Sequence, residues 1–424
     1  MPWPGLRRRF PVLAIRDFRL LLADRLIAPA AFAFSLVGVA FAVLDLTGST
    51  ADLSYVLAAQ IAPMLVFALA GGVIADRVAP QKVIVAANLL IAAGEGTFGL
   101  LVLAGRPALW QMIALETVTG SGMAMFYPAS QALLPRLVPG SLLQEASALS
   151  RLAMNTAQMG GAAVAGAFVA VAGPGWALAG CGTGMVATVP LLLSIRAPGE
   201  NRGRGGGLVR ELREGWAEFV SRRWLWVIVA EFSVVMACWY GGFQVLGPVV
   251  AQRYLGGPAA WGTITAADAV GLILGGLVSL RYAPRRPIRF VALIGGACAL
   301  SPLSLALRWP LLAVCVSAVA LGVTVEMMMV QWTVALARHI PPGKLARVSS
   351  YDVLGSVVAM PAGALAAGPL AAAIGLVPAE FAAAALTLVA SALALLPREV
   401  RALGVGEAGE TSPVAPTAVS GSVP

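Results

Sequence analysis

The chain has 424 residues, of which 59% are hydrophobic and only 12% are charged, and its mean hydropathy is +0.85. An ordinary soluble domain carries roughly 25% charged residues, so this composition excludes a soluble enzyme and predicts a membrane protein. The apolar runs are continuous, as in residues 58–75 and 374–396, and do not alternate with polar residues. Continuous runs predict membrane-spanning helices and exclude a transmembrane β-barrel.

Breaks at glycine, proline and charge clusters divide the chain into apolar segments of about 20 residues, the length that one membrane helix needs. Twelve such spans are predicted, at residues 18–43, 52–75, 82–104, 108–131, 146–172, 175–195, 223–250, 259–280, 288–307, 309–334, 350–372 and 374–396. The sequence therefore predicts an all-α membrane protein with twelve transmembrane helices.

The longest polar stretch, residues 196–222, contains GENRGRGGG and separates two sets of six spans. We expect residues 1–195 to form an N-terminal half, 196–222 a cytoplasmic linker and 223–397 a C-terminal half. Residues 398–424 are small and polar with little apolar content to bury, which predicts a disordered tail. A repeat supports the two halves, because GGVIADRVAP at residues 71–80 matches GGLVSLRYAP at residues 275–284.

The formal net charge is +9, and the basic residues lie in short patches between apolar segments. This placement indicates residues that orient the chain in a membrane, and not a nucleic-acid-binding surface. Basic residues concentrate on the cytoplasmic side of membrane proteins. If the N-terminus is cytoplasmic, 25 of the 29 basic residues fall on that side, and only Arg106, Arg253 and Arg308 fall outside. The distribution predicts twelve spans with both termini in the cytoplasm.

The loop after the second predicted span resembles the signature of the major facilitator superfamily, in which a glycine precedes an Asp-Arg pair and basic residues. The matching residues are Gly72, Asp76, Arg77 and Lys82. Ala79 stands where a glycine is usual, and Pro80 and Gln81 stand where an arginine is usual. The resemblance implies two pseudo-symmetric six-helix halves, a gating role for this loop, and transport by alternating access. A plain helix-loop charge pair is the alternative for Asp76 and Arg77.

Four segments resemble the branch of that family that includes the enterobactin exporter and macrolide efflux proteins. They are FRLLLADRLIA from Phe18, LTGSTADLSYVLAAQIAPMLVFALAGGVIADR from Leu46, FYPASQALLPRLVPGSLLQEASAL from Phe126 and HIPPGKLARVSS from His339. This resemblance implies export of an antibiotic, a siderophore or another secondary metabolite, in antiport with protons, across a bacterial cell membrane. The fifth span reads MGGAAVAG at residues 159–166 and lacks the proline of the family's antiporter signature.

Charged residues inside spans are costly, so they indicate functional positions. The candidates for proton coupling or substrate binding are Glu116, Glu231, Glu326, Asp24, Arg25 and Asp268, with Glu95 ranked last. The ranking follows the family architecture, in which spans 1, 4, 7 and 10 line the central cavity and span 3 supports from outside. A buried carboxylate can hold a proton near neutral pH. Interhelical hydrogen bonds, or an ion pair between Asp24 and Arg25, are the structural alternatives.

Polar and aromatic side chains in the same spans predict an adaptable pocket for a large amphiphile. The cavity candidates are Gln60, Asn155, Gln158, Tyr240 and Gln244. Arg25 and Arg151 are candidates for contact with an anionic substrate. Lipid-interface positions are the alternative for many aromatic residues.

The sequence contains no recognisable motif for binding a cofactor or a metal. The phosphate-binding pattern GxxxxGK[ST] is absent, a single histidine is present, and the four cysteines lie in apolar runs without metal-ligand spacing. We therefore expect no metal, no cofactor and no enzymatic activity, and a monomer that binds a small molecule and protons in the lipid bilayer. Uptake of a small nutrient, and a non-transporting membrane scaffold or sensor, are the competing hypotheses.

Overall fold

The computed structural model describes residues 10–75, 79–105, 107–196, 216–282, 284–340 and 342–403, and within them leaves the side chains of 66–75, 127, 342–347, 350 and 353 undescribed. Every regular element in these ranges is a helix, which confirms the predicted all-α class. Nine helical segments in these ranges are long and apolar enough to cross a membrane by length and composition. The other three predicted spans fall on helices α3, α5 and α6, and the count of twelve stays a prediction.

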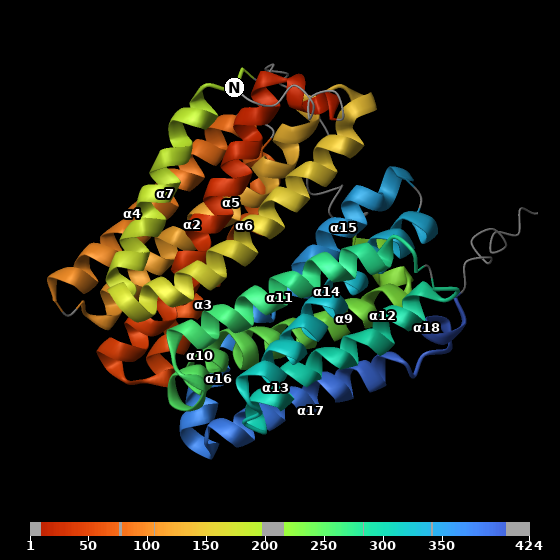
Figure 1. The fold of residues 1–424 in the computed structure, drawn as a ribbon. Coiled ribbons are helices and arrows are strands. Elements are labelled where there is room, and N and C mark those ends of the chain that lie inside the picture. Colours follow the sequence, from red (N-terminus) through yellow and green to blue (C-terminus); the bar gives the residue numbers. More distant parts are fainter. Residues whose placement is uncertain are drawn as a thin grey trace, which may run out of the picture.

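Six long helices form the N-terminal half (Figure 1). They are α2 (Arg16–Thr47), α3 (Thr50–Ala75), α4 (Pro80–Ala104), α5 (Leu109–Leu137), α6 (Leu143–Ala172) and α7 (Pro174–Leu193), with short 3-10 turns η1 (Pro11–Ala14) and η2 (Gly140–Leu142). Within this half α4 packs against α5 and α7, α2 against α6 and α7, and α3 against α5.

The C-terminal half repeats this plan with more interruptions. Its seventh membrane segment is a continuous helix built from α9 (Arg223–Cys238), the π-helix η3 (Trp239–Leu246), α10 (Gly247–Val250) and the π-helix η4 (Ala251–Leu255). The remaining elements are α11 (Pro258–Ser279), α12 (Pro287–Gly295), η5 (Gly296–Ala299), α13 (Leu300–Ala306), α14 (Leu311–His339), α15 (Pro342–Val357), α16 (Met360–Ile374), α17 (Leu376–Ala394) and α18 (Arg398–Ala402).

Helix α18 lies in the segment predicted to be a disordered tail. It packs on α12 and α9, and the Val400 side chain is fully buried. The prediction is therefore wrong for residues 398–402, because Val400, together with Leu403 directly after the helix, packs on an apolar cluster of the C-terminal half. The rest of the predicted tail, from residue 404 onward, lies outside the described residues.

Proline begins helices and glycine ends them at positions that the sequence indicates. Pro80, Pro174 and Pro258 stand in the first turn of their helices, where the missing N–H costs nothing. Gly48 ends α2 in the left-handed conformation, at a φ of 64°, and its N–H donates to the Leu44 carbonyl. Such a residue closes a helix without the steric cost of a Cβ. The turns within the N-terminal half are short, and helices that follow one another in the chain run in opposite directions.

This antiparallel order gives the bundle two ends. We call the end where α2, α4 and α9 begin the basic end, and the end where α3 and α11 begin the far end. The basic end carries most of the described arginine and lysine side chains outside the spans: Arg16, Arg19, Lys82, Arg136, Arg222, Arg223, Arg281, Arg285, Arg286, Arg289, Arg338, Arg398 and Arg401. The far end carries Arg253 and Arg308. The charge asymmetry expected from the sequence is thus built into the fold.

The two halves contact each other mainly through two helix pairs, α6 with α11 and α3 with α16. Glycines bring the first pair into backbone contact, since a Cβ on Gly166 would lie 2.7 Å from Gly262 Cα. Gly368 on α16 packs in the same manner against Thr50 and Ala51 of α3. Small residues allow such close approach of membrane helices. Both glycine contacts lie toward the far end.

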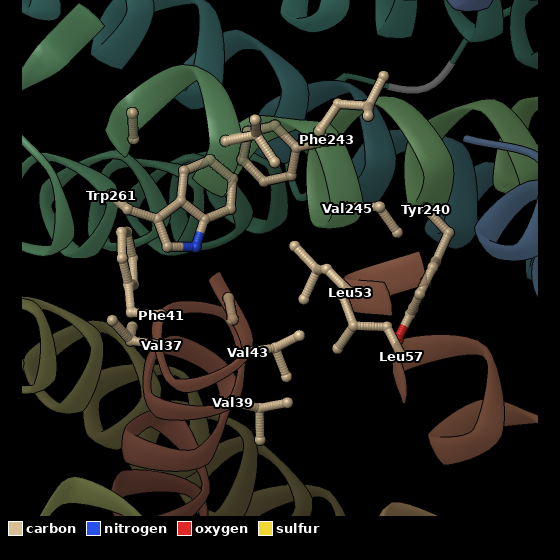
Figure 2. Packing of buried hydrophobic residues seen from close by; sticks show 14 of the residues in the cluster. Val37, Val39, Phe41, Val43, Leu53, Leu57, Tyr240, Phe243, Val245 and Trp261 are labelled. Atoms are coloured by element: carbon tan, nitrogen blue, oxygen red, sulfur yellow. The ribbon is translucent and has the colours of Figure 1, made fainter. Parts of the chain in front are cut away.

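Apolar packing differs between the two ends. Toward the far end, one cluster combines residues of both halves, including Val37, Phe41 and Leu53 with Phe243 and Trp261 (Figure 2). Toward the basic end the clusters are separate: one contains only residues between positions 12 and 195, and another only residues between 219 and 400. The halves are therefore joined at the far end and diverge at the basic end between α6 and α15 (Figure 1).

Candidate functional site

Only part of the predicted gating loop falls within the described residues. Asp76 and Arg77 lie outside the described residues, and Gly72 lies in the last turn of α3. Lys82 is exposed in the first turn of α4. Beside it, Gln81 donates its side-chain amide to the Leu192 carbonyl of α7 at 2.6 Å and so fixes the start of α4. A gating role for this loop stays a prediction.

Glu116 on α5 is fully buried inside the N-terminal half. Gln60 on α3 donates its side-chain amide to Glu116 Oε2 at 2.7 Å. One turn further along α5, Gly120 has no room for a Cβ, because the Gln60 backbone carbonyl occupies that position. This glycine brings α3 and α5 close enough for the hydrogen bond to form. Gln60 is thus buried and hydrogen-bonded to a carboxylate, and its place in the wall of a cavity stays a prediction.

Glu95, the candidate ranked last from the sequence, lies on α4, which packs against the α5 helix of Glu116. It is fully buried, and the Ser35 hydroxyl on α2 donates to Glu95 Oε1 at 2.6 Å. Gly94 faces Thr119 of α5, and Gly96 faces Gly182 of α7. The two glycines that flank Glu95 were the available signal, because they mark this part of α4 as a close helix contact.

Asp24 and Arg25 diverge from each other although they are neighbours on α2. Asn88 on α4 donates to Asp24 Oδ1 at 3.4 Å and to Thr188 Oγ1 on α7 at 2.7 Å. Arg25 donates to the Ser130 carbonyl on α5 and reaches Met154 Sδ on α6, both at 3.0 Å. No ion pair within 4 Å joins these two described residues. Arg25 instead connects three helices of one half.

Glu231 on α9 faces the supporting helices of its own half. The Ser391 hydroxyl on α17 donates to Glu231 Oε1 at 2.7 Å, and Gly295 of α12 lies against the same oxygen. The expectation that Glu231 lines the central space between the halves is therefore not met. The rotation of α9 directs this side chain away from the N-terminal half.

A second buried carboxylate of this half, Glu380 on α17, was not selected from the sequence. It is fully buried, and neither carboxylate oxygen has a hydrogen-bond partner among the described residues. Its Oε2 faces Gly242 of the π-helix η3. The segment around it, LVPAEFAAAAL, gave no local signal beyond the charge itself.

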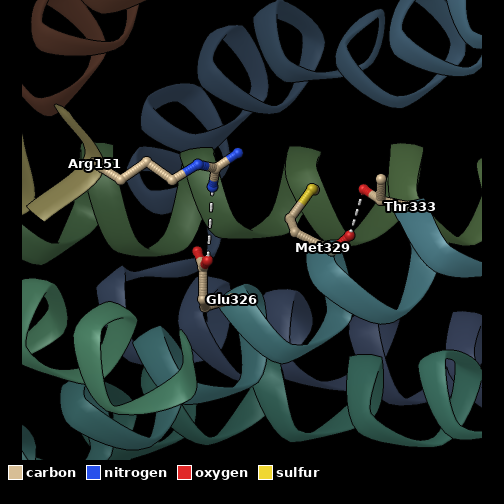
Figure 3. Close-up of polar contacts among 4 residues, drawn as sticks. All are labelled: Arg151, Glu326, Met329 and Thr333. Carbon is tan, nitrogen blue, oxygen red and sulfur yellow. Dashed lines mark hydrogen bonds and ion pairs between the residues drawn. The ribbon is translucent and has the colours of Figure 1, made fainter. Parts of the chain in front are cut away.

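Glu326 and Arg151 form an ion pair between the two halves. Arg151 Nη1 on α6 lies 3.9 Å from Glu326 Oε1 on α14 (Figure 3). The Arg151 side chain is 75% exposed and that of Glu326 is 22% exposed. Asp268 on α11 is half-buried on the helix that packs against α14. Of the six charged candidates, Glu326 is therefore the one with a charged partner across the halves in the described structure.

The polar pocket candidates are dispersed along the interface. Asn155 is half-buried and Gln158 exposed on α6, and Gln244 is half-buried in η3. Tyr240 of η3 is buried and points toward Leu57 of α3 (Figure 2). The structure thus brings Tyr240 to the helix that carries Gln60, whereas Asn155 and Gln158 lie on the other interface helix of the N-terminal half.

Metal binding finds no support in the described residues. They contain no group of three or more His, Cys, Asp or Glu side chains arranged to hold an ion. Cys181 and Cys298 are buried free thiols.

Two bundles joined by α6–α11 and α3–α16 agree with a family model that matches residues 26–306, that of the Major Facilitator Superfamily. The chain belongs to this superfamily. The predicted family is therefore confirmed, together with the two-bundle helical fold.

Curated relatives of this superfamily member include efflux proteins. Macrolide efflux protein A of Streptococcus pyogenes is 25% identical over 246 residues, which cover 57% of this chain and 60% of the relative. The multidrug efflux pump Tap of Mycolicibacterium fortuitum is 26% identical over 377 residues, covering 84% of this chain and 90% of the relative. These relatives confirm the predicted efflux branch as the one that the chain resembles, although the match spans less than two thirds of the macrolide efflux protein.

Solved superfamily structures have the same fold at low sequence identity. The nucleoside transporter NupG superposes with a TM-score of 0.70 at 10% identity and covers 89% of this chain and 98% of its own. A bacterial homolog of the human lysosomal transporter Spinster, inward-facing and unoccupied, gives a TM-score of 0.69 at 16% identity, covering 89% and 96%. These likenesses concern the fold alone.

Proposed function

We propose that this superfamily member is a secondary active transporter of the bacterial cell membrane. It exports an amphiphilic small molecule, such as an antibiotic, a siderophore or another secondary metabolite, in exchange for protons. The observation that carries the proposal is the contrast between the two ends, with one shared apolar cluster at the far end and separate clusters at the basic end. A transporter that alternates between two states needs such an asymmetric closure around a central site.

The basic end faces the cytoplasm in this proposal, with both termini on that side. The asymmetry of arginine and lysine between the two ends supports this orientation. Substrate then enters from the cytoplasm between the diverging halves, and the names of the efflux relatives support movement outward from there.

Coupling to protons is supported by carboxylates buried in an apolar bundle. Glu116 and Asp24 are fully buried and accept hydrogen bonds only from neutral amides in the described structure. A carboxylate without an ion-pair partner in such a place can bind and release a proton as its surroundings change. One proton moving down a potential of 100 mV supplies about 2.3 kcal/mol, enough to concentrate a solute severalfold.

Proton flux in inside-out vesicles tests this function. Vesicles energised by respiration receive a panel of macrolides, siderophores and dyes, with wild type beside empty membranes, Asp76→Asn and Glu116→Gln. We expect at least one compound to discharge the proton gradient only when the wild-type protein is present, and Glu116→Gln to lose this effect.

Three outcomes would contradict the proposal in different ways. Movement of a labelled compound without any proton movement would replace antiport by facilitated transport, or by another coupling ion if the compound accumulates. Movement of substrate only in the inward direction, in right-side-out vesicles, would replace export by uptake. Absence of flux for any compound would favour a membrane scaffold or sensor.

A further inference from the structure

Helices α9, α12 and α18 meet at the basic end of the C-terminal half. α18 packs on α12 and on α9, and Figure 1 shows it beside α12. Each of the three helices presents arginine side chains at this end. These exposed arginines are Arg223 on α9, Arg286 and Arg289 at the start of α12, and Arg398 on α18. Four guanidinium groups are therefore gathered on helices that touch one another.

The charge of these four arginines is not balanced by other described residues. None of the four forms an ion pair with a carboxylate in the described part of the chain. Of the acidic residues beside the starts of α9 and α18, Glu218 pairs with Arg222, and Glu399 is exposed without a described ion pair. Like charges that lie close together repel one another, so this surface favours the binding of an anion.

An exposed apolar surface continues from these arginines along the same helices. On α12, exposed side chains recur at Arg286, Arg289 and Leu293, which is the spacing of one helix face. Leu396 follows the end of α17, directly before Arg398, and is also exposed. Because α12 and α17 pack against each other, the cationic surface adjoins an apolar surface that faces the lipid.

Helix α9 has the same order of side chains. Trp226 stands three residues after Arg223, on the same helix face, and both side chains are exposed. Tryptophan is enriched where the apolar part of a membrane meets the headgroups. Trp226 therefore indicates the level of the lipid headgroups around this half. A free anion in water would use only the arginines, whereas a phospholipid matches both the cationic and the apolar surface.

We infer that this surface binds an anionic phospholipid of the adjoining leaflet. The phosphate lies among Arg286, Arg289 and Arg398, and an acyl chain lies along Leu293 and Leu396. A guanidinium group binds phosphate oxygens through two parallel hydrogen bonds. A zwitterionic phospholipid is disfavoured, because its ammonium group would face the arginines. In the proposed orientation this leaflet is the cytoplasmic one, but the inference depends neither on the transported compound nor on the direction of transport.

The bound lipid also holds α18 on the bundle. This helix has 5 residues, and it packs through Val400 and the following Leu403 on the apolar cluster of the C-terminal half. A phosphate bound by Arg398 and by an arginine of α12 connects the two helices outside that apolar contact. We therefore expect the lipid to raise the melting temperature of the protein.

Lipid titration of the purified full-length protein tests this inference. Protein in a neutral detergent receives phosphatidylglycerol, phosphatidylcholine or glycerol phosphate, and native mass spectrometry and melting curves report the binding. We expect wild type to retain phosphatidylglycerol in preference to the other two. Arg289→Gln with Arg398→Gln should weaken this binding about 25-fold, since each arginine near a lipid headgroup contributes about fivefold. Arg16→Gln with Arg136→Gln is the matched control and should bind as wild type does, because it removes the same charge from exposed positions at the basic end of the other half.

Three results would overturn the lipid site. Equal retention of phosphatidylglycerol and phosphatidylcholine would show that charge does not select the lipid. An equal loss of binding in the control variant would assign the effect to the overall surface charge. Binding of glycerol phosphate as tight as that of phosphatidylglycerol would replace the lipid by a free phosphate ester. A failure of proton-coupled export would change none of these measurements, so it is distinguishable from a failure of this inference.

Discussion

Arg151 Nη1 on α6 lies 3.9 Å from Glu326 Oε1 on α14, and this ion pair joins the two halves on the side where their apolar clusters are separate. A pair in which one partner is three-quarters exposed contributes little to stability, at most about 1 kcal/mol. Its effect is therefore expected in the balance between conformations and not in folding.

Neutralising this pair should shift that balance. We expect Arg151→Gln or Glu326→Gln to change the ratio of the two states by up to about fivefold, in the direction of greater separation at the basic end. Spin labels at residues 136 and 338 report the distance between the halves. The charge-reversed double variant, Arg151→Glu with Glu326→Arg, should restore the wild-type distribution, and a failure to do so would refute a role for charge.

The glycine contact between α6 and α11 should not tolerate a methyl group. A Cβ on Gly166 would lie 2.7 Å from both Gly262 Cα and the Pro258 carbonyl oxygen, so Gly166→Ala must push the helices apart. Overpacking of this kind costs roughly 1–3 kcal/mol. We expect a lower melting temperature and slower transport.

Gly160 supplies the control for this prediction. It lies on the same helix, and a Cβ placed there would have nothing within 4 Å, so Gly160→Ala should melt and transport as wild type does. Alanine favours a helix over glycine, so propensity cannot lower stability at either position. An equal loss in both variants would therefore contradict the contact as the cause.

Replacement of Arg25 by lysine should destabilise the protein. Its guanidinium reaches the Ser130 carbonyl on α5 and Met154 Sδ on α6 at the same time, which a single ammonium group without the guanidinium fork cannot do. We expect Arg25→Lys to lose one of these contacts and to lower the free energy of unfolding by about 1–3 kcal/mol. The melting temperature of the purified protein should fall accordingly. A wild-type melting curve together with altered transport of anionic compounds would instead assign Arg25 to the substrate.

The proposed orientation places Arg308 and Arg401 on opposite sides of the membrane. Arg308 lies in the turn between α13 and α14 at the far end, and Arg401 lies in α18 at the basic end. An impermeant maleimide should label Arg308→Cys in intact cells, above the background of the four native cysteines, and Arg401→Cys only after permeabilisation. The reverse pattern would invert the topology.

Helix boundaries were predictable from the sequence because proline and glycine act locally. Pro80 and Pro174 start helices and Gly48 ends one, each through its own backbone geometry. The π-helix η3 was not predicted, since a change from α to π hydrogen bonding leaves the apolar composition of WYGGFQVL unchanged.

The site was less predictable, because the facing direction of a side chain depends on the rotation of its helix. Span order alone placed Glu231 toward the central space and ranked Glu95 last among the charged candidates. The structure directs Glu231 to Ser391, and it buries Glu95 inside the N-terminal half against Ser35. Glycines flanking Glu95 carried that information, since close packing needs small neighbours, whereas nothing near Glu231 fixed the rotation of α9.

The shared apolar cluster has a thermodynamic consequence for the transport cycle. Separating the halves at the far end exposes large side chains such as Phe41, Phe243 and Trp261 to water, at about 25 cal/mol for each Å². The opposite state must offset this loss by bringing the clusters of the basic end together. We therefore expect the conformation with the basic end apart to predominate when neither substrate nor a transferred proton is bound.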